Sequence, residues 1–291
     1  MITSLQVYSI SDAPPARQVP VVFDSPHSGT DIPVDFDYSA PQSAMSSAVD
    51  WYVDALYGSA PAFGAALLAA RFPRTYVDPN RNVADIDIAL IDGDWPGPVR
   101  PGPKTESGMG LLRRLALPGV PVHDRLLSVA EAVCRIENYY EPYRAALQRL
   151  LDARHARFDE VWFVDCHSMK SVGNAMNTDA GAPRPDVVLG DGDGTSCAPE
   201  FTALVAEAFR ELGYSAAIND PYRGADLVQT HGDPNAGRHS LQIELNRSLY
   251  LDETTFNRTT GFDRLQQNLT RVVAAVCEFA KARAQSQRAA P

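Results

Sequence analysis

Two histidines follow apolar runs at points where a buried strand would end. Val161–Val164 leads into Asp165 and then His167, and Val21–Phe23 leads into a segment that contains His27. Short apolar runs bounded by turn residues are typical of buried strands, and open α/β sheets bind ligands at the carboxyl ends of their strands. Imidazole is a frequent zinc ligand. We therefore predict that His27 and His167 share one metal site. The structural alternative is that each is a hydrogen-bonded histidine near the core.

A catalytic zinc ion needs a third protein ligand and an open position. The sequence has no H-E-x-x-H motif, so the third ligand must be a carboxylate from another part of the chain. Four aspartates are candidates: Asp31, Asp50, Asp54 and Asp165. Asp50 lies at the start of a predicted helix, where it could reach the sheet edge or simply interact with the helix N-terminus. Asp165 shares a strand face with His167 and is better placed to orient a ligand.

An arginine-rich segment, residues 71–81, could bind a carboxylate. The planar guanidinium group matches the geometry of a carboxylate, and Arg74 and Arg81 lie here beside Asn80, which adds a donor and an acceptor. A surface turn is the structural alternative, because Asp-Pro-Asn is a common turn sequence.

A glutamate lies inside a predicted strand, Leu241–Leu245. The strand's apolar residues share one face, which leaves Gln242 and Glu244 on the other. Burying a carboxylate costs free energy unless it is paired or functional. Glu244 could act as a general base on water, or it could lie on the solvated face of an edge strand.

Strands and helices alternate along the chain. We expect strands at 21–23, 75–77, 161–165, 187–189, 216–219 and 241–245, and helices at 48–62, 128–151, 199–212 and 262–282. Pro142 predicts a kink or break near Glu141, and the Pro- and Gly-rich residues 92–103 predict a long surface loop. Alternating elements indicate an α/β fold with a parallel or mixed sheet. Because the sequence contains no low-complexity linker, we expect a single domain over residues 1–291.

Composition excludes several classes of protein. The 291 residues are 45% hydrophobic and 21% charged, which is typical of a globular chain. The formal net charge is −10 and no basic stripe appears, so a nucleic-acid partner is not expected. No signal peptide or membrane span is evident, and we expect a cytoplasmic protein. The four cysteines form neither a thiolate zinc motif nor a disulfide framework, and Cys166 should point away from His167.

Seven segments, in this order, resemble the N-formylglutamate amidohydrolase family. They are residues 23–29, 49–54, 70–81, 165–169, 185–191, 219–224 and 238–247. The resemblance implies a zinc-dependent hydrolase of a linear amide C–N bond. It also implies a three-layer α/β fold like that of the zinc carboxypeptidases, with a mixed, eight-stranded sheet flanked by helices.

The resemblance implies that His27 and His167 are ligands of one Zn²⁺ ion. The acid that relatives commonly carry three residues after the first histidine falls here on Thr30. The third ligand must then come from later in the chain, and we choose Asp50.

Catalytic and substrate-binding roles are implied in the same way. Glu244 resembles the glutamate that activates the attacking water, and Arg74 lies near the position of an arginine that polarises the scissile carbonyl. Substrate contacts are expected from Asn80 and Arg81, which resemble a carboxylate-binding pair, with Arg238 and His239 as additional candidates.

The implied reaction is hydrolysis of the small molecule N-formyl-L-glutamate to formate and L-glutamate, as in histidine degradation. One alternative is a deacylase or peptidase acting on another N-acyl acidic amino acid. A second is a non-catalytic binding protein on the same fold, which would have no need of a general base such as Glu244. The oligomeric state is left open.

Overall fold

The centre of the molecule is a mixed sheet of seven strands in the order β1-β3-β2-β8-β11-β9-β10. The structure is a computed structural model and describes residues 6–289. The strands are β1 (Tyr8–Ser11), β2 (Val21–Ser25), β3 (Ala66–Ala70), β8 (Val161–Met169), β9 (Val187–Gly190), β10 (Ala216–Ile218) and β11 (Arg238–Asn246). β3, β2, β8 and β11 are parallel, whereas β1 pairs antiparallel with β3 and β9 pairs antiparallel with β11. The mixed α/β sheet is therefore confirmed, but it has seven strands in the described residues and not eight.

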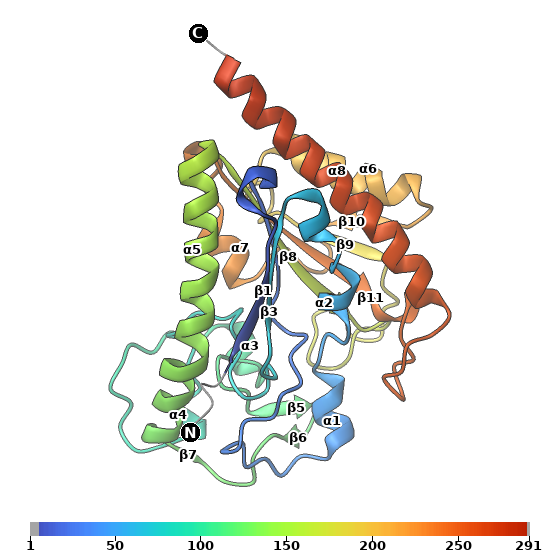
Figure 1. Cartoon of the computed structure of the whole chain (residues 1–291). Helices are drawn as coiled ribbons and strands as arrows, with labels where there is room; N and C mark the ends of the chain where they lie inside the picture. The colour runs from blue at the N-terminus through green and yellow to red at the C-terminus, as the bar shows by residue number, and fades with distance from the viewer. Residues whose placement is uncertain (1–5, 290–291) are drawn as a thin grey trace.

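Helices cover both faces of the sheet, as the predicted three-layer fold requires (Figure 1). One layer contains α4 (Val129–Arg135), α5 (Glu141–Phe158) and α7 (Asp226–His231). The other contains α2 (Val53–Leu56), α6 (Pro199–Glu211) and α8 (Gly261–Ala289). Each layer encloses its own buried hydrophobic cluster against the sheet.

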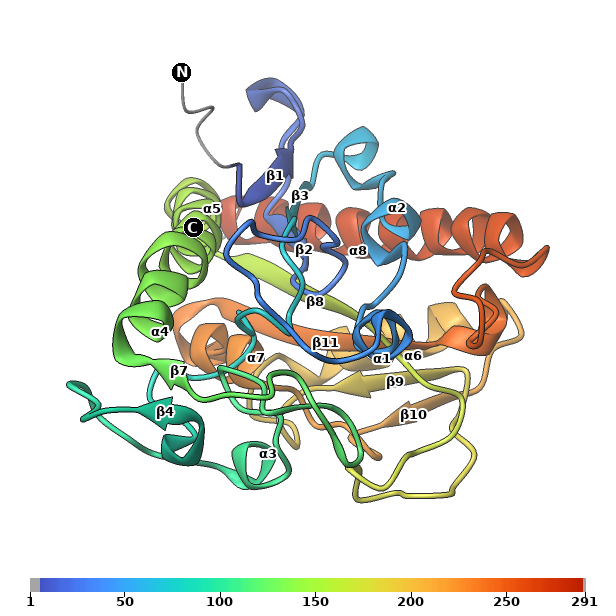
Figure 2. The same ribbon diagram turned by 90° about the horizontal axis from the view of Figure 1, so that it is seen from below.

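Short elements gather at one end of the main sheet, seen from below in Figure 2. They are α1 (Gln42–Ser47), α3 (Pro103–Glu106), and two small sheets that pair β4 (Ile91–Asp92) with β7 (Leu127–Ser128) and β5 (Leu115–Leu117) with β6 (Val120–Pro121). The loop between β4 and α3 has no regular structure, as residues 92–103 predicted.

Side chains of the central strand β8 alternate between the two layers. Trp162, Val164 and Cys166 pack in the cluster beneath α6 and α8, whereas Phe163 packs in the cluster on the α5 side. Cys166 therefore points away from His167, as alternation predicted. The strand's nine residues are all buried, so Asp165 and His167 are polar groups that need partners.

The predicted helix over residues 48–62 is wrong, because the chain turns at Asp50. α1 ends at Ser47, α2 begins only at Val53, and a 3-10 turn follows at residues 60–63. The backbone N–H of Asp50 donates to the carbonyl of His27 at 3.0 Å, and Tyr52 has a φ of 62°. A tertiary hydrogen bond thus overrides the local helix propensity.

The structure confirms one further prediction about the local elements and contradicts another. The predicted break near Glu141 is confirmed, because a π-helical turn at residues 136–140 separates α4 from α5 and Pro142 lies in the first turn of α5. The predicted strand at residues 75–77 is wrong, since that segment is a turn. The edge strand β1 was not predicted. Among residues 6–289, no helix combines the length and apolar character needed to cross a bilayer.

Candidate metal and substrate site

Three neighbouring parallel strands bring polar side chains to one sheet edge. His27 follows the end of β2, while β8 and β11 carry His167 and Glu244 near their carboxyl ends. The register pairs Glu244 with His167, and Asp165 with Asp24 of β2. Ligands of open α/β sheets bind at this edge, so the topology alone places these groups around one pocket.

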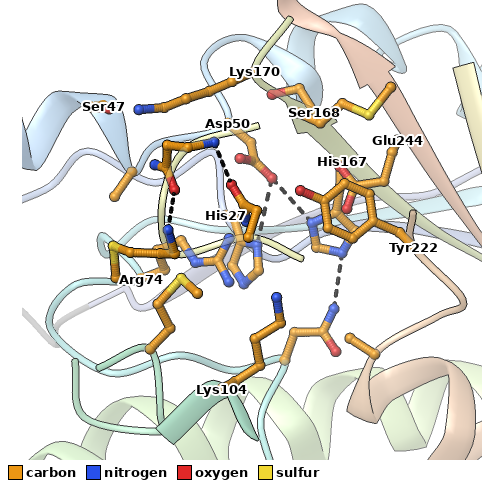
Figure 3. A pocket seen from close by; sticks show the side chains of 18 of the residues that line it. His27, Ser47, Asp50, Arg74, Lys104, His167, Ser168, Lys170, Tyr222 and Glu244 are labelled. Atoms are coloured by element: carbon orange, nitrogen blue, oxygen red, sulfur yellow. Dashed lines mark hydrogen bonds and ion pairs between the residues drawn. The ribbon is translucent and has the colours of Figure 1, made fainter. Parts of the chain in front are cut away.

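His27, Asp50 and His167 form a buried group whose ligand-type atoms all lie within 4.8 Å of one another. Figure 3 shows Asp50 between the two imidazole rings. Its Oδ2 lies 3.1 Å from Nδ1 of His167 and 3.5 Å from Nδ1 of His27. The turn that interrupts the predicted helix places this carboxylate above the sheet edge.

The alternative third ligands lie elsewhere. The side chain of Asp31 is 60% exposed and pairs with Arg71 at 2.8 Å. Asp54 follows in α2, where its backbone N–H donates to Ser28 Oγ. Neither belongs to the buried group around the histidines.

A carboxylate lies behind each histidine, on the side away from Asp50. Nε2 of His27 is 2.7 Å from Oδ1 of Asp78, and Nε2 of His167 is 2.7 Å from Oδ1 of Asp165. The Asp78 carboxylate keeps the proton on Nε2 of His27 and leaves Nδ1 of that ring as the metal-binding atom. Within the described residues, the buried Nδ1 of His27 has no hydrogen-bond partner. Two imidazole nitrogens and a carboxylate oxygen therefore fit a metal ion such as zinc.

Two arginines bind carboxylates of this site, one at Asp50 and the other at Asp78. Arg247, at the end of β11, donates from Nη2 to Asp50 Oδ1 at 2.7 Å and from Nη1 to the carbonyl of Ser47 at 2.9 Å. Arg74 donates to Asp78 Oδ2 at 2.6 and 3.0 Å. Sequence reasoning missed Asp78 and Arg247 as site residues, although both lie within the motifs that suggested the family.

Burial and neighbouring charges shift the pKa values of His27, His167 and Asp78 in different directions. Burial and the nearby Arg74 lower the pKa of His27, which favours the neutral form that binds metals. Burial also disfavours the charged form of His167, but the Asp165 carboxylate outweighs it and raises that pKa well above its usual value. Burial opposes ionisation of Asp78, yet Arg74 and His27 hold its pKa well below the usual range.

Glu244 projects from β11 beside His167 (Figure 3). Its side chain is buried, and Oε1 accepts a hydrogen bond from Nε2 of Gln242 at 3.0 Å. Burial raises its pKa to about 7, with His167 lowering it and Asp50 raising it. A carboxyl group that titrates near neutral pH can both take and return a proton.

The predicted residues of the arginine-rich segment also reach the pocket. Arg74, Asn80 and Arg81 line it. Arg81 donates from Nε to the carbonyl of Met109 at 3.0 Å and from Nη1 to that of Asn80 at 2.7 Å. The Asn80 amide holds the surrounding elements, since its nitrogen donates to Asp165 at 2.8 Å and its oxygen accepts from Leu227 N–H at 2.8 Å.

Arg238 and His239 were predicted as substrate contacts, and the structure corrects this. Both lie at the beginning of β11, at the opposite end of the strand from Glu244. Arg238 pairs with Asp152 at 2.7 Å, and His239 stacks on Trp162 with ring centroids 3.8 Å apart. The nine-residue strand β11 separates these two side chains from the site. This separation was not evident from the sequence, where both residues belong to the same motif as Glu244.

The walls of the pocket are strongly cationic. The positively charged side chains that line it are Arg74, Arg81, Lys104, Arg113, Lys170, Arg184 and Arg247, whereas the acidic ones are Asp50 and Glu244. In Figure 3, Lys104 and Lys170 lie on opposite sides of the histidine pair. A chain with a net charge of −10 therefore carries a local positive field that suits an anionic small molecule.

Comparisons with known proteins agree on one family. A family model described as N-formylglutamate amidohydrolase matches residues 19–251. A relative from Pseudomonas putida, named N-formylglutamate deformylase, is 27% identical over 242 residues, covering 81% of this chain and 84% of the relative. A relative of the same name from Pseudomonas aeruginosa is 28% identical, with the same coverage.

Solved structures point the same way. A crystal structure of N-formylglutamate amidohydrolase from Ralstonia eutropha JMP134 matches with a TM-score of 0.90 at 40% identity, covering 96% of this chain and 99% of that chain. The gene product Atu2144 from Agrobacterium tumefaciens shares the fold, with a TM-score of 0.64 at 18% identity and coverage of 94% and 96%.

Proposed function

Because this chain belongs to the N-formylglutamate amidohydrolase family, we propose that it hydrolyses N-formyl-L-glutamate to formate and L-glutamate, a reaction that fits histidine degradation. The observation that carries the proposal is the pocket itself. It combines a ligand set for one metal ion with a buried carboxyl group and cationic walls. The relatives are named for this deformylation.

We assign His27, Asp50 and His167 as the ligands of one Zn²⁺ ion. The donor set supports this choice, because two imidazole nitrogens and one carboxylate oxygen are common around catalytic zinc. When bound, zinc supplies Lewis acidity, which polarises a carbonyl group and makes water a better nucleophile. Asp78 and Asp165 orient the two imidazole rings from behind.

Glu244 is assigned as the general base and then the general acid. It takes a proton from the water that attacks the formyl carbon, and it returns that proton to the amide nitrogen as the C–N bond breaks. Formate and the free amine of L-glutamate are the products. Its pKa near 7 supports both steps, because a group of this kind exchanges protons in either direction at neutral pH.

Arg74 and Arg81 are assigned to the charges of the substrate. Arg74 would stabilise negative charge that develops on the formyl oxygen, using the part of its guanidinium group that does not hold Asp78. Arg81, with Asn80 beside it, would bind a substrate carboxylate. Both arginines line the pocket that contains the metal ligands.

The test is a panel of N-formyl and N-acetyl derivatives of Glu, Asp, Gln and Ala, scored by the free amine released. N-formyl-L-glutamate should give the highest kcat/KM. Glu244→Gln should keep its zinc but lose on the order of 10²–10⁴-fold in turnover, whereas Arg238→Gln, from the far end of the same strand, should retain activity. Preference for an N-acetyl substrate, or full activity of Glu244→Gln, would contradict the proposal.

A further inference from the structure

The carboxylate of Asp78 has more guanidinium neighbours than it can bind. Its Oδ2 accepts two hydrogen bonds from Arg74, at 2.6 and 3.0 Å. Its Oδ1 accepts the backbone N–H of Asn80 at 3.0 Å and contacts Nε2 of His27 at 2.7 Å. These four contacts use about all the lone pairs that a carboxylate offers, so another cation nearby needs a different partner.

Arg113 is such a cation. It is 7% exposed, and its Nη2 lies 3.9 Å from Oδ2 of Asp78, which is too long for a hydrogen bond. Its buried Nε has no hydrogen-bond partner in the part of the chain that the structure describes. Burial lowers the pKa of Arg113 well below its usual value, and Arg74 lowers it further. The ion pair with Asp78 at 3.9 Å compensates this buried charge only in part, and a bound anion would complete the compensation.

The segment that carries Arg113 also gives the pocket an apolar wall. Met109, Ala116 and Leu117 line the same pocket as Arg113. An apolar wall takes methylene groups out of water, and a guanidinium group pairs with a carboxylate. The segment therefore suits a ligand in which a short methylene chain ends in a carboxylate.

We propose that Arg113 binds the side-chain carboxylate of the substrate and thereby selects acidic amino acids. This inference rests on the proposed function, in which Arg81 binds the other carboxylate. The α-carboxylate is attached to the carbon that carries the scissile nitrogen, so it must lie close to the metal ligands. Arg81 is next to Asn80, whose amide nitrogen lies 2.9 Å from Nε2 of His167. The side-chain carboxylate is two methylene groups further away, towards the apolar wall.

The neighbouring residue offers a matched control. Arg114 pairs with Asp87 at 2.7 Å, and its side chain is 38% exposed. It does not line the pocket of Arg113. Arg113→Met and Arg114→Met therefore remove the same charge from adjacent positions, one inside the pocket and one outside it.

The experiment compares N-formyl-L-glutamate with N-formyl-L-glutamine, whose neutral side chain has nearly the same shape. Arg113→Met should lower kcat/KM for the glutamate substrate on the order of 10²-fold, the loss expected for hydrogen bonds to a charged group. The value for the glutamine substrate should hardly change, so that the preference disappears. Arg114→Met should keep the preference. An equal loss on both substrates would overturn the inference.

Binding of L-glutamate and L-glutamine to the zinc-loaded proteins, measured by calorimetry, separates this inference from the proposed function. The unchanged protein should prefer L-glutamate, and Arg113→Met should lose that preference whether or not formyl amides are hydrolysed. If the unchanged protein fails to hydrolyse N-formyl-L-glutamate, the proposed function alone is wrong. If Arg113→Met still prefers L-glutamate, the role of Arg113 is wrong. Arg113→Lys, which keeps the charge but not the planar fork, should retain part of the preference and serves if the Met variant does not fold.

Discussion

Nε2 of His27 lies 2.7 Å from Oδ1 of Asp78, on the side of the ring opposite the nitrogen that faces Asp50. Oδ1 of Asp165 lies 2.7 Å from Nε2 of His167. The Asp78 carboxylate accepts a hydrogen bond from Nε2 of His27 and so fixes the orientation of that ring. Nε2 of His167 lies against both the Asp165 carboxylate and the Asn80 amide nitrogen. Metal affinity should therefore depend on two residues that are not themselves ligands.

Asp78→Asn tests this dependence. The amide keeps the size of the side chain but removes the charge that orients His27, so zinc affinity should fall on the order of 10–100-fold. Competition with a chromogenic chelator measures the change. Asp152→Asn, at a surface aspartate paired with Arg238, is the control and should bind zinc normally. A lower melting temperature with unchanged zinc affinity would mean that Asp78 only stabilises the fold.

The identity of the third ligand can be decided by three parallel variants. Asp50→Asn should abolish stoichiometric zinc binding, because Asp50 is the carboxylate within the buried group. Asp31→Asn and Asp54→Asn should each bind about one equivalent of zinc, since both residues lie outside it. Metal content after gel filtration gives the answer, and stoichiometric zinc in Asp50→Asn would exclude Asp50 as a ligand.

Burial of Glu244 should cost the metal-stripped protein stability. Burial raises its folded pKa to about 7, above an unfolded value of about 4.3. The folded state then binds more protons between these two values, so stability falls as the pH rises through this window. Glu244→Gln cannot ionise and should be more stable than its parent at pH 8, by up to about 4 kcal/mol, with little difference near pH 4.

Denaturant unfolding at both pH values measures this effect. Glu278→Gln, at a glutamate whose side chain is 73% exposed, should show no such difference. If Glu244→Gln were less stable than its parent by a similar amount at both pH values, the hydrogen bond from Gln242 would matter more than the burial of charge.

Sequence patterns predicted the parts of the fold that depend on local apolar periodicity. The strands β2, β8, β9, β10 and β11 and the helices α6 and α8 were all expected, although β8 continues to Met169 and α8 to Ala289, beyond the predicted ends at 165 and 282. His27 and His167 could be placed at one sheet edge because each follows an apolar run where a strand was expected to end, whereas Glu244 was predicted only on the polar face of its strand. In the structure, the parallel pairing of β2, β8 and β11 brings the three side chains to the same edge of the sheet.

What the sequence could not reveal depends on contacts between distant residues. The turn at Asp50 interrupts a helix-prone stretch because its N–H bonds to the carbonyl of His27. Arg113 lies between short elements where no periodicity marks a side chain as buried. Arg238 and His239 share a motif with Glu244, yet the length of an extended strand takes them to the other end of the sheet.

The most direct test of the account is metal removal and reconstitution. A strong chelator should abolish release of formate from N-formyl-L-glutamate, because the proposed reaction depends on one metal ion held by His27, Asp50 and His167. Zinc titrated into the stripped protein should restore activity linearly and reach a plateau at about one equivalent per chain, the stoichiometry of a single catalytic site. Undiminished activity in the stripped protein, or no hydrolysis at the plateau of zinc binding, would contradict it.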